Sequence, residues 1–115
     1  MRAWLMDSYQ GIDKLRLGEV PDPHPGPTDV LVKLKYAALN PADAFLAQGL
    51  YPAKPILPHI LGRDGVGDVE IVGSRVENIR VGEPVGILRC EIGVEIPGTL
   101  AEKVVVPTES LVQIP

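Results

Sequence analysis

The sequence predicts a mainly β fold, either a small sandwich or a partly open barrel, with one or two short helices. Three observations support this prediction. The 115 residues have the length of a single domain. The 12 glycines and 12 prolines are more than a bundle of regular helices tolerates. Short β-branched runs are also separated by proline or glycine at close intervals, as is typical of all-β folds.

The clearest strand signal lies in residues 30–39. Its even-numbered positions up to Tyr36 are apolar or aromatic, whereas Lys33 and Lys35 are charged. Such alternation is typical of a half-buried strand, and it places Tyr36 on the buried face. Weaker patterns of the same kind predict strands at residues 2–8, 14–20, 65–73, 84–90 and 99–106.

A helix of about two turns is predicted to begin at Pro41 and to end just before Gly49. Asn40 can cap its first turn, Pro41 suits the first helical position, and Gly49 can adopt the left-handed conformation that ends a helix. Phe45 and Leu46 are expected to face inward.

Charge and cysteine content exclude several classes of protein. Eleven Lys and Arg against fifteen Asp and Glu give a net charge of −4 with no basic run, which argues against a nucleic-acid partner. One cysteine, Cys90, cannot form an internal disulfide. The chain has neither a signal-peptide pattern nor an apolar stretch that could span a bilayer. We therefore expect a cytoplasmic protein without a membrane partner.

The glycines at positions 62, 65 and 67 resemble a nucleotide-binding loop only superficially. Their spacing, G-x-x-G-x-G, is the reverse of the dinucleotide fingerprint, and a β-branched run follows where a helix should begin. We therefore expect a tight turn that leads into a strand.

Metal and nucleophile patterns are also weak. The candidate ligands His24, His59 and Cys90 are far apart in the sequence, and no serine lies in a nucleophile elbow. Surface or structural roles are expected for both histidines. Residue chemistry alone thus predicts a β-rich domain without a self-contained active site.

Several motifs in order together resemble the N-terminal, GroES-like domain of the medium-chain dehydrogenase/reductase superfamily, to which the zinc-containing alcohol dehydrogenases belong. The motifs occupy residues 25–33, 39–43, 58–67, 72–76, 81–85 and 98–107. The resemblance implies a GroES-like partly open barrel that spans residues 1–115. It also implies that the cofactor-binding Rossmann domain of such enzymes lies outside this chain.

Two positions indicate the branch of the superfamily. Asn40 stands where zinc alcohol dehydrogenases have a cysteine ligand, and Arg63 stands where they have a histidine ligand. This pattern, with Tyr51 in a G-x-Y stretch, is similar to the zinc-free quinone oxidoreductases and zeta-crystallins. The resemblance therefore implies no zinc, and NADPH as the cofactor of the full-length enzyme.

The resemblance also implies roles for individual residues. Tyr51 and Asn40 are the candidate catalytic residues, and Asn40 is also the candidate contact to the nicotinamide side of the cofactor. Phe45, Arg63 and Asp43 are the candidate residues of the substrate cleft, although Phe45 replaces a tyrosine found in several relatives. Three alternatives remain: a plain helix cap for Asn40, a packing role for Tyr51, and a surface charge or a salt bridge to Asp64 or Asp43 for Arg63.

The function implied is hydride transfer from NADPH to a small planar quinone or other conjugated carbonyl. The isolated chain is expected to be inactive, and its expected partners are its own second domain and, through an exposed face, a further copy of itself. A non-enzymatic binding or assembly module on the same barrel is the alternative from another class. A fragment of a zinc alcohol dehydrogenase fits the residues less well.

Overall fold

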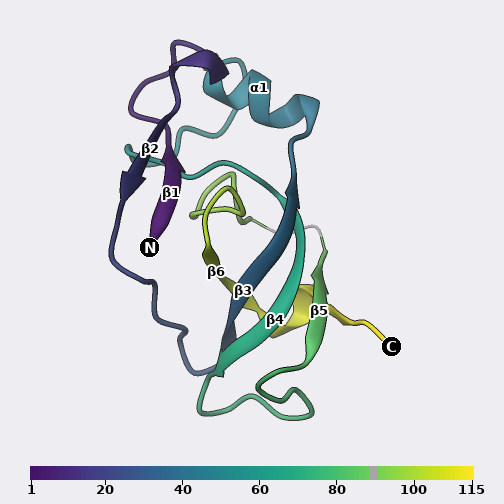
Figure 1. Ribbon diagram of the computed structural model, residues 1–115. Helices are drawn as coiled ribbons and strands as arrows, with labels where there is room; N and C mark the ends of the chain where they lie inside the picture. Colours follow the sequence, from purple (N-terminus) through teal and green to yellow (C-terminus); the bar gives the residue numbers. More distant parts are fainter. Residues whose placement is uncertain (89–90) are drawn as a thin grey trace.

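The computed structural model describes residues 1–88 and 91–115 and shows two antiparallel sheets and one short α-helix (Figure 1). The smaller sheet pairs β1 (Arg2–Leu5) with β2 (Arg16–Glu19). The larger sheet has the strand order β6-β3-β4-β5-β7. Its strands are β3 (Asp29–Ala38), β4 (Asp64–Val72), β5 (Pro84–Ile87), β6 (Lys103–Pro107) and β7 (Leu111–Gln113). The helix is α1 (Pro41–Ala47), and single 3-10 turns cover Ile12–Lys14 and Thr108–Ser110.

The mainly β fold expected from the sequence is confirmed. Strands β3 and β4 are long and curved, so that the larger sheet curls into part of a barrel, while α1 lies near the end of the molecule that also holds β1 and β2 (Figure 1). Residues of the larger sheet and of the segment after β5 form a buried apolar cluster. Its members are Val30, Val32, Val69, Val85, Ile87, Ile92, Val104 and Val106.

The pattern predicted for β3 fails at one position. Tyr36 is 76% exposed, although alternation placed it on the buried face. The pairing of β3 with β4 shifts register between Leu31 and Val32 and again between Leu34 and Tyr36. A bulge of this kind changes the side-chain alternation, so the face that buries Val32 is no longer the face of Tyr36.

The helix begins at Pro41 as predicted and ends at Ala47, one residue early. The residue that follows Gln48 is Gly49, whose φ of 74° is the left-handed conformation expected at such an end. Leu46 is buried, but the expectation that Phe45 also faces inward is wrong, because Phe45 is 51% exposed. The buried residues of α1 are Asp43, Leu46 and Ala47, whose i, i+3, i+4 spacing defines one helix face, and Phe45 lies off that face.

The remaining strand boundaries differ from the prediction at loops and edges. The first strand stops at residue 5 and not 8, the second begins at 16, and the strand expected at 99–106 covers 103–107. Strand β7 was not predicted, because three residues carry no periodic signal. The end of the strand expected at 84–90 and Cys90 lie outside the described residues.

The glycine-rich segment leads into a strand, as the sequence indicated, but the expected tight turn is only a bend at Arg63, and Gly65 and Gly67 lie within β4. Gly62 has a φ of 105°, and a Cβ at Gly62 would collide with the Thr99 hydroxyl. A Cβ at Gly67 would collide with the backbone carbonyl of Lys33 on the adjacent strand. These glycines are therefore explained by close backbone packing.

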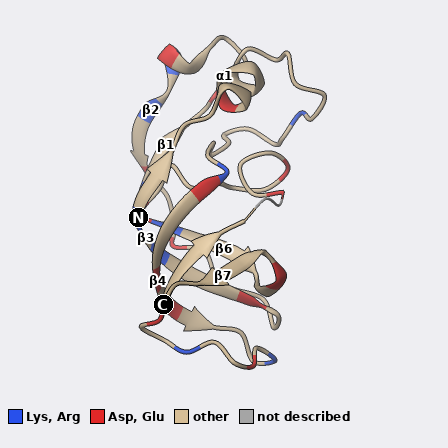
Figure 2. Cartoon of the chain, turned by 90° about the vertical axis from the view of Figure 1, so that its right-hand side faces the viewer, with Lys and Arg blue, Asp and Glu red and all other residues tan. Residues whose placement is uncertain are grey.

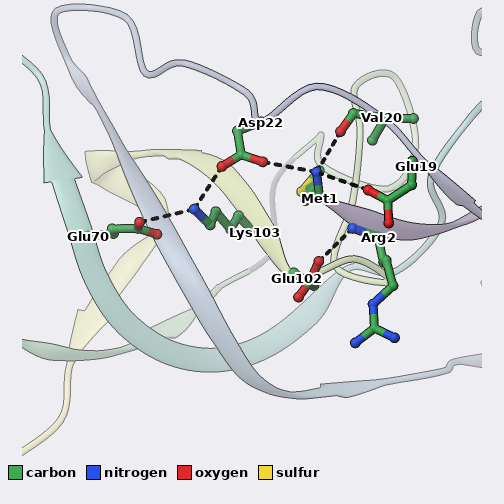
Figure 3. Close-up of polar contacts among 8 residues, drawn as sticks. All are labelled: Met1, Arg2, Glu19, Val20, Asp22, Glu70, Glu102 and Lys103. Carbon is green, nitrogen blue, oxygen red and sulfur yellow. Dashed lines mark hydrogen bonds and ion pairs between the residues drawn. The ribbon is translucent and has the colours of Figure 1, made fainter.

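A small ionic network joins the start of the chain to the larger sheet (Figure 3). The Lys103 ammonium lies 2.8 Å from the Asp22 carboxylate and 3.0 Å from that of Glu70. The Met1 ammonium lies 3.0 Å from the other oxygen of Asp22. Asp22 therefore links the loop after β2 to β6 and, through Lys103, to β4.

Charged residues of both signs are spread along the chain (Figure 2). Within the described residues, no helix is long and apolar enough to cross a membrane. The absence of a nucleic-acid partner remains a prediction from the charge pattern.

Candidate functional site

The pairing of β3 with β4 brings together the residues of the candidate site. Ala38 at the end of β3 pairs with Asp64 at the start of β4. Asn40 follows two residues later as the N-cap of α1, and its Nδ2 donates a hydrogen bond of 2.6 Å to the Asp64 carboxylate. Since a carboxylate only accepts, this contact fixes which end of the Asn40 amide faces Asp64.

Asp43 connects two of the segments that form the site. Its carboxylate is 1% exposed and accepts hydrogen bonds from the backbone N–H groups of Asn40, at 2.8 Å, and Gly62, at 3.2 Å. The first bond is half of a capping box at the start of α1. The second ties the helix to the segment before β4. Asp43 thus holds Asn40 and that segment in place, and it does not line the pocket described next.

Tyr51 and Arg63 are the other two polar residues of the candidate site. The Arg63 Nη1 lies 3.4 Å from the Tyr51 hydroxyl oxygen, a long hydrogen bond. The Tyr51 ring packs beside the buried cluster that contains Met6 and Leu46. The packing role left open for Tyr51 is therefore real, and it positions the hydroxyl group beside Arg63.

These side chains surround a polar pocket of about 480 Å³. The pocket is lined by Asn40, Ala42, Tyr51, Arg63 and Asp64. Three of the five expected site residues thus meet in it, namely Asn40, Tyr51 and Arg63. Phe45 lies outside it on the exposed side of α1. Sequence reasoning considered Asp64 only as a salt-bridge partner of Arg63; its position beside Arg63 was the available signal for a role in the site.

An apolar face adjoins the polar pocket, and Asp64 lines both. This apolar face comprises exposed side chains of β3, β4, β5 and β7 and of the segments that follow β5 and β7. Its large members are Tyr36, Val66, Leu88, Val112 and Ile114, which are 37–76% exposed.

Comparison with known proteins identifies the family. Residues 26–115 match the model of the alcohol dehydrogenase GroES-like domain. This chain belongs to the alcohol dehydrogenase GroES-like domain family. A quinone oxidoreductase of Pseudomonas aeruginosa is 36% identical over 108 residues, which cover 94% of this chain and 31% of that protein.

Other members of the family are similarly close. An NADPH-dependent alkenal/one oxidoreductase of Arabidopsis thaliana is 38% identical over 107 residues, or 89% of this chain and 28% of its own length. A crystal structure of an NAD-dependent alcohol dehydrogenase superimposes with a TM-score of 0.93 at 38% identity, over all of this chain and 40% of that one. This GroES-like domain therefore spans about a third of the length of its curated relatives.

The histidines of this GroES-like domain differ in environment. His24 is exposed, whereas His59 is 3% exposed and its Nε2 lies 2.9 Å from the Gly93 carbonyl oxygen. Burial lowers the pKa of His59, although the hydrogen bond to Gly93 and the charge of Asp43 oppose that effect. In the part of the chain that the structure describes, no three His, Cys, Asp or Glu side chains converge as metal ligands would.

Proposed function

We propose that this chain is the substrate-side domain of an NADPH-dependent, zinc-independent oxidoreductase that reduces a quinone or another conjugated carbonyl. The observation that carries the proposal is the pocket in which Tyr51 and Asn40 lie together beside Arg63. The names of the relatives from Pseudomonas aeruginosa and Arabidopsis thaliana agree with this reaction class.

The chemistry requires stabilisation of negative charge on the oxygen of the acceptor. NADPH, when bound, supplies the hydride for this class of reaction. The Tyr51 hydroxyl can donate a hydrogen bond to the carbonyl oxygen, and the Asn40 amide can donate another. The Arg63 guanidinium adds positive charge at the same pocket. The nicotinamide side of the cofactor would contact Asn40.

The side chains in the pocket do not fit a zinc ion. Zinc sites in proteins use thiolates, imidazoles and carboxylates. Arg63 is a cation without a lone pair to donate, and the Asn40 Nδ2 already donates to Asp64. Zinc therefore has no role in the proposed reaction.

The proposal is tested in a protein that joins this domain to a cofactor domain, such as the corresponding part of the Pseudomonas aeruginosa relative. Tyr51→Phe is expected to lower kcat/KM for a quinone about tenfold or more and to leave the NADPH KM nearly unchanged. Tyr36→Phe, on the exposed end of β3, is the matched control and should have no effect. Equal activity of Tyr51→Phe and the unmodified protein would refute the role of Tyr51. An inactive fusion that nevertheless binds NADPH would favour the non-enzymatic alternative.

The isolated 115-residue chain is expected to bind NADPH weakly and to be inactive. Its glycine-rich segment leads into β4 and not into a helix, so the described residues offer no helix N-terminus after that segment for the phosphates. Calorimetry should detect no micromolar affinity. A micromolar dissociation constant would show that this chain has its own cofactor site.

A further inference from the structure

The hydrogen bond between Asn40 and Asp64 restricts what Asn40 can offer to a ligand. One Nδ2 hydrogen is committed to the Asp64 carboxylate at 2.6 Å. The Asn40 side chain also faces the backbone N–H of Asp43 in the capping box, and that arrangement directs its oxygen toward the helix. The second Nδ2 hydrogen is therefore the group that remains for the pocket.

Tyr51 is restricted in a similar way by Arg63. A guanidinium group only donates, so the Tyr51 oxygen accepts in the 3.4 Å contact with Arg63. The hydroxyl hydrogen of Tyr51 then remains to be donated elsewhere. Asp64, the first residue of β4, and Arg63, which precedes it, thus each contact one of the two polar side chains Asn40 and Tyr51 that line the same pocket.

We propose that Asp64 is a positioning residue, which holds the Asn40 amide so that its second N–H joins the Tyr51 hydroxyl as a donor to one ligand oxygen. The class of ligand is a planar molecule with an oxygen that carries negative charge, such as an enolate or a phenolate. This inference rests on the proposed function, because the same pocket would receive the oxygen of the carbonyl acceptor as it gains charge.

The proposal predicts a change in anion affinity, on removal of the Asp64 charge, that is opposite to the change expected from Coulomb repulsion alone. Asp64 is a negative charge at the pocket, so removing it should strengthen the binding of an anion if Coulomb repulsion decides. If Asp64 acts through Asn40, its replacement in Asp64→Asn should weaken the binding. The new side-chain amide can donate as well as accept, so it no longer holds the Asn40 amide in one orientation.

The experiment uses the 115-residue chain, labelled with 15N, and the probe 4-nitrophenolate at a pH where it is ionised. The dissociation constant is measured from the chemical shifts of the Asn40 side-chain amide, with uncharged 4-nitroanisole as the comparison ligand. Asp64→Asn is expected to weaken phenolate binding about tenfold, the loss of one charge-assisted hydrogen bond. Asp64→Glu should restore much of the affinity, because it keeps an acceptor at this position.

Asp68→Asn is the control, because Asp68 lies on the same strand and pairs with Lys35 at 3.3 Å. It removes the same charge and should leave phenolate binding within about twofold. Unchanged or stronger binding by Asp64→Asn would overturn the inference.

If Asp64→Asn fails to fold, the inference is tested on the unmodified chain. The Asn40 amide signals should move on addition of 4-nitrophenolate and much less with 4-nitroanisole, and signals that do not move would overturn the inference. Neither readout requires turnover. Binding with the expected Asp64 dependence in a domain whose fusion proves inactive would support the inference and refute the proposed function.

Discussion

Asp43 is the single side chain on which the geometry of the candidate site depends most. Its buried carboxylate accepts two backbone hydrogen bonds from segments that are otherwise separate, the start of α1 and the segment before β4. In Asp43→Asn the new amide group would face one of these N–H groups, and that donor would lose its partner. We expect the free energy of unfolding to fall by about 2–3 kcal/mol, measured by urea denaturation.

Asp68→Asn is also the control for this stability measurement. Asp68 is partly exposed, so its ion pair with Lys35 should contribute less than about 1 kcal/mol. Equal losses in Asp43→Asn and Asp68→Asn would contradict the structural role given to Asp43.

His59 predicts how stability depends on pH. Burial lowers its pKa from the ordinary value of 6.5, so the unfolded chain binds a proton at His59 more readily than the folded chain does. The free energy of unfolding should therefore be highest above pH 6.5 and decrease as the pH falls from about 6.5 toward the lower folded-state pKa. The slope for one such group cannot exceed about 1.4 kcal/mol per pH unit.

The measurement is urea denaturation at a series of pH values. His59→Gln should flatten the decrease between neutral and mildly acidic pH, and His24→Gln, at an exposed position, should not. A decrease of the same steepness in His59→Gln would show that other groups cause it.

At the scale of the element, the pairing of β3 with β4 depends on the absence of a side chain at residue 67. The Cβ in Gly67→Ala would meet the Lys33 carbonyl and the Leu34 backbone. Because both are backbone atoms, the strands would have to separate. We expect a loss of at least about 2 kcal/mol in the free energy of unfolding.

Gly86→Ala, on the neighbouring strand β5, is the matched control. Its Cβ would come no closer than 3.9 Å to the nearest side chains, so we expect a change of less than about 1 kcal/mol. Thermal unfolding of the two variants separates the effects. A Gly67→Ala variant as stable as Gly86→Ala would mean that the two strands are not so closely paired.

At the scale of the whole molecule, the apolar face beside the polar pocket predicts self-association of the isolated chain. Large apolar patches that remain exposed are usually interaction sites. In the isolated chain, the face formed by Tyr36, Val66 and their neighbours can be covered only by another copy. Sedimentation velocity should show a coefficient that rises with protein concentration.

Substitutions on this face should reduce the association. The double variant Tyr36→Ser, Val112→Ser is expected to stay monomeric at concentrations where the unmodified chain associates. Ile56→Ser, which removes a 90% exposed side chain that does not line this face, should have no effect. A strictly monomeric unmodified chain would contradict the prediction.

Local sequence patterns were sufficient to predict the class of fold, the position of α1 and most strands. These features depend on local chemistry, such as the capping of a helix by Asn40, the φ of Gly49 and the β-branched runs, and local chemistry can be recognised in a linear sequence. Local patterns did not determine the exposure of Tyr36 and Phe45. Tyr36 follows a bulge, and the outward position of Phe45 depends on which side of a two-turn helix packs against the core.

In the candidate site, too, some features could be predicted from the sequence and others depend on the tertiary structure. Asn40, Tyr51 and Arg63 could be predicted because motifs carried them, and the folded chain brings them into one pocket. Only the three-dimensional arrangement gave Asp64 its partner and Asp43 its contact with Gly62, whereas the contact of Asp43 with Asn40 is local to the start of the helix. Asn40 and Asp64 are separated by 24 residues, and their hydrogen bond depends on the register in which β3 pairs with β4. Register is set by the packing of both strands together, and neither strand's sequence determines it alone.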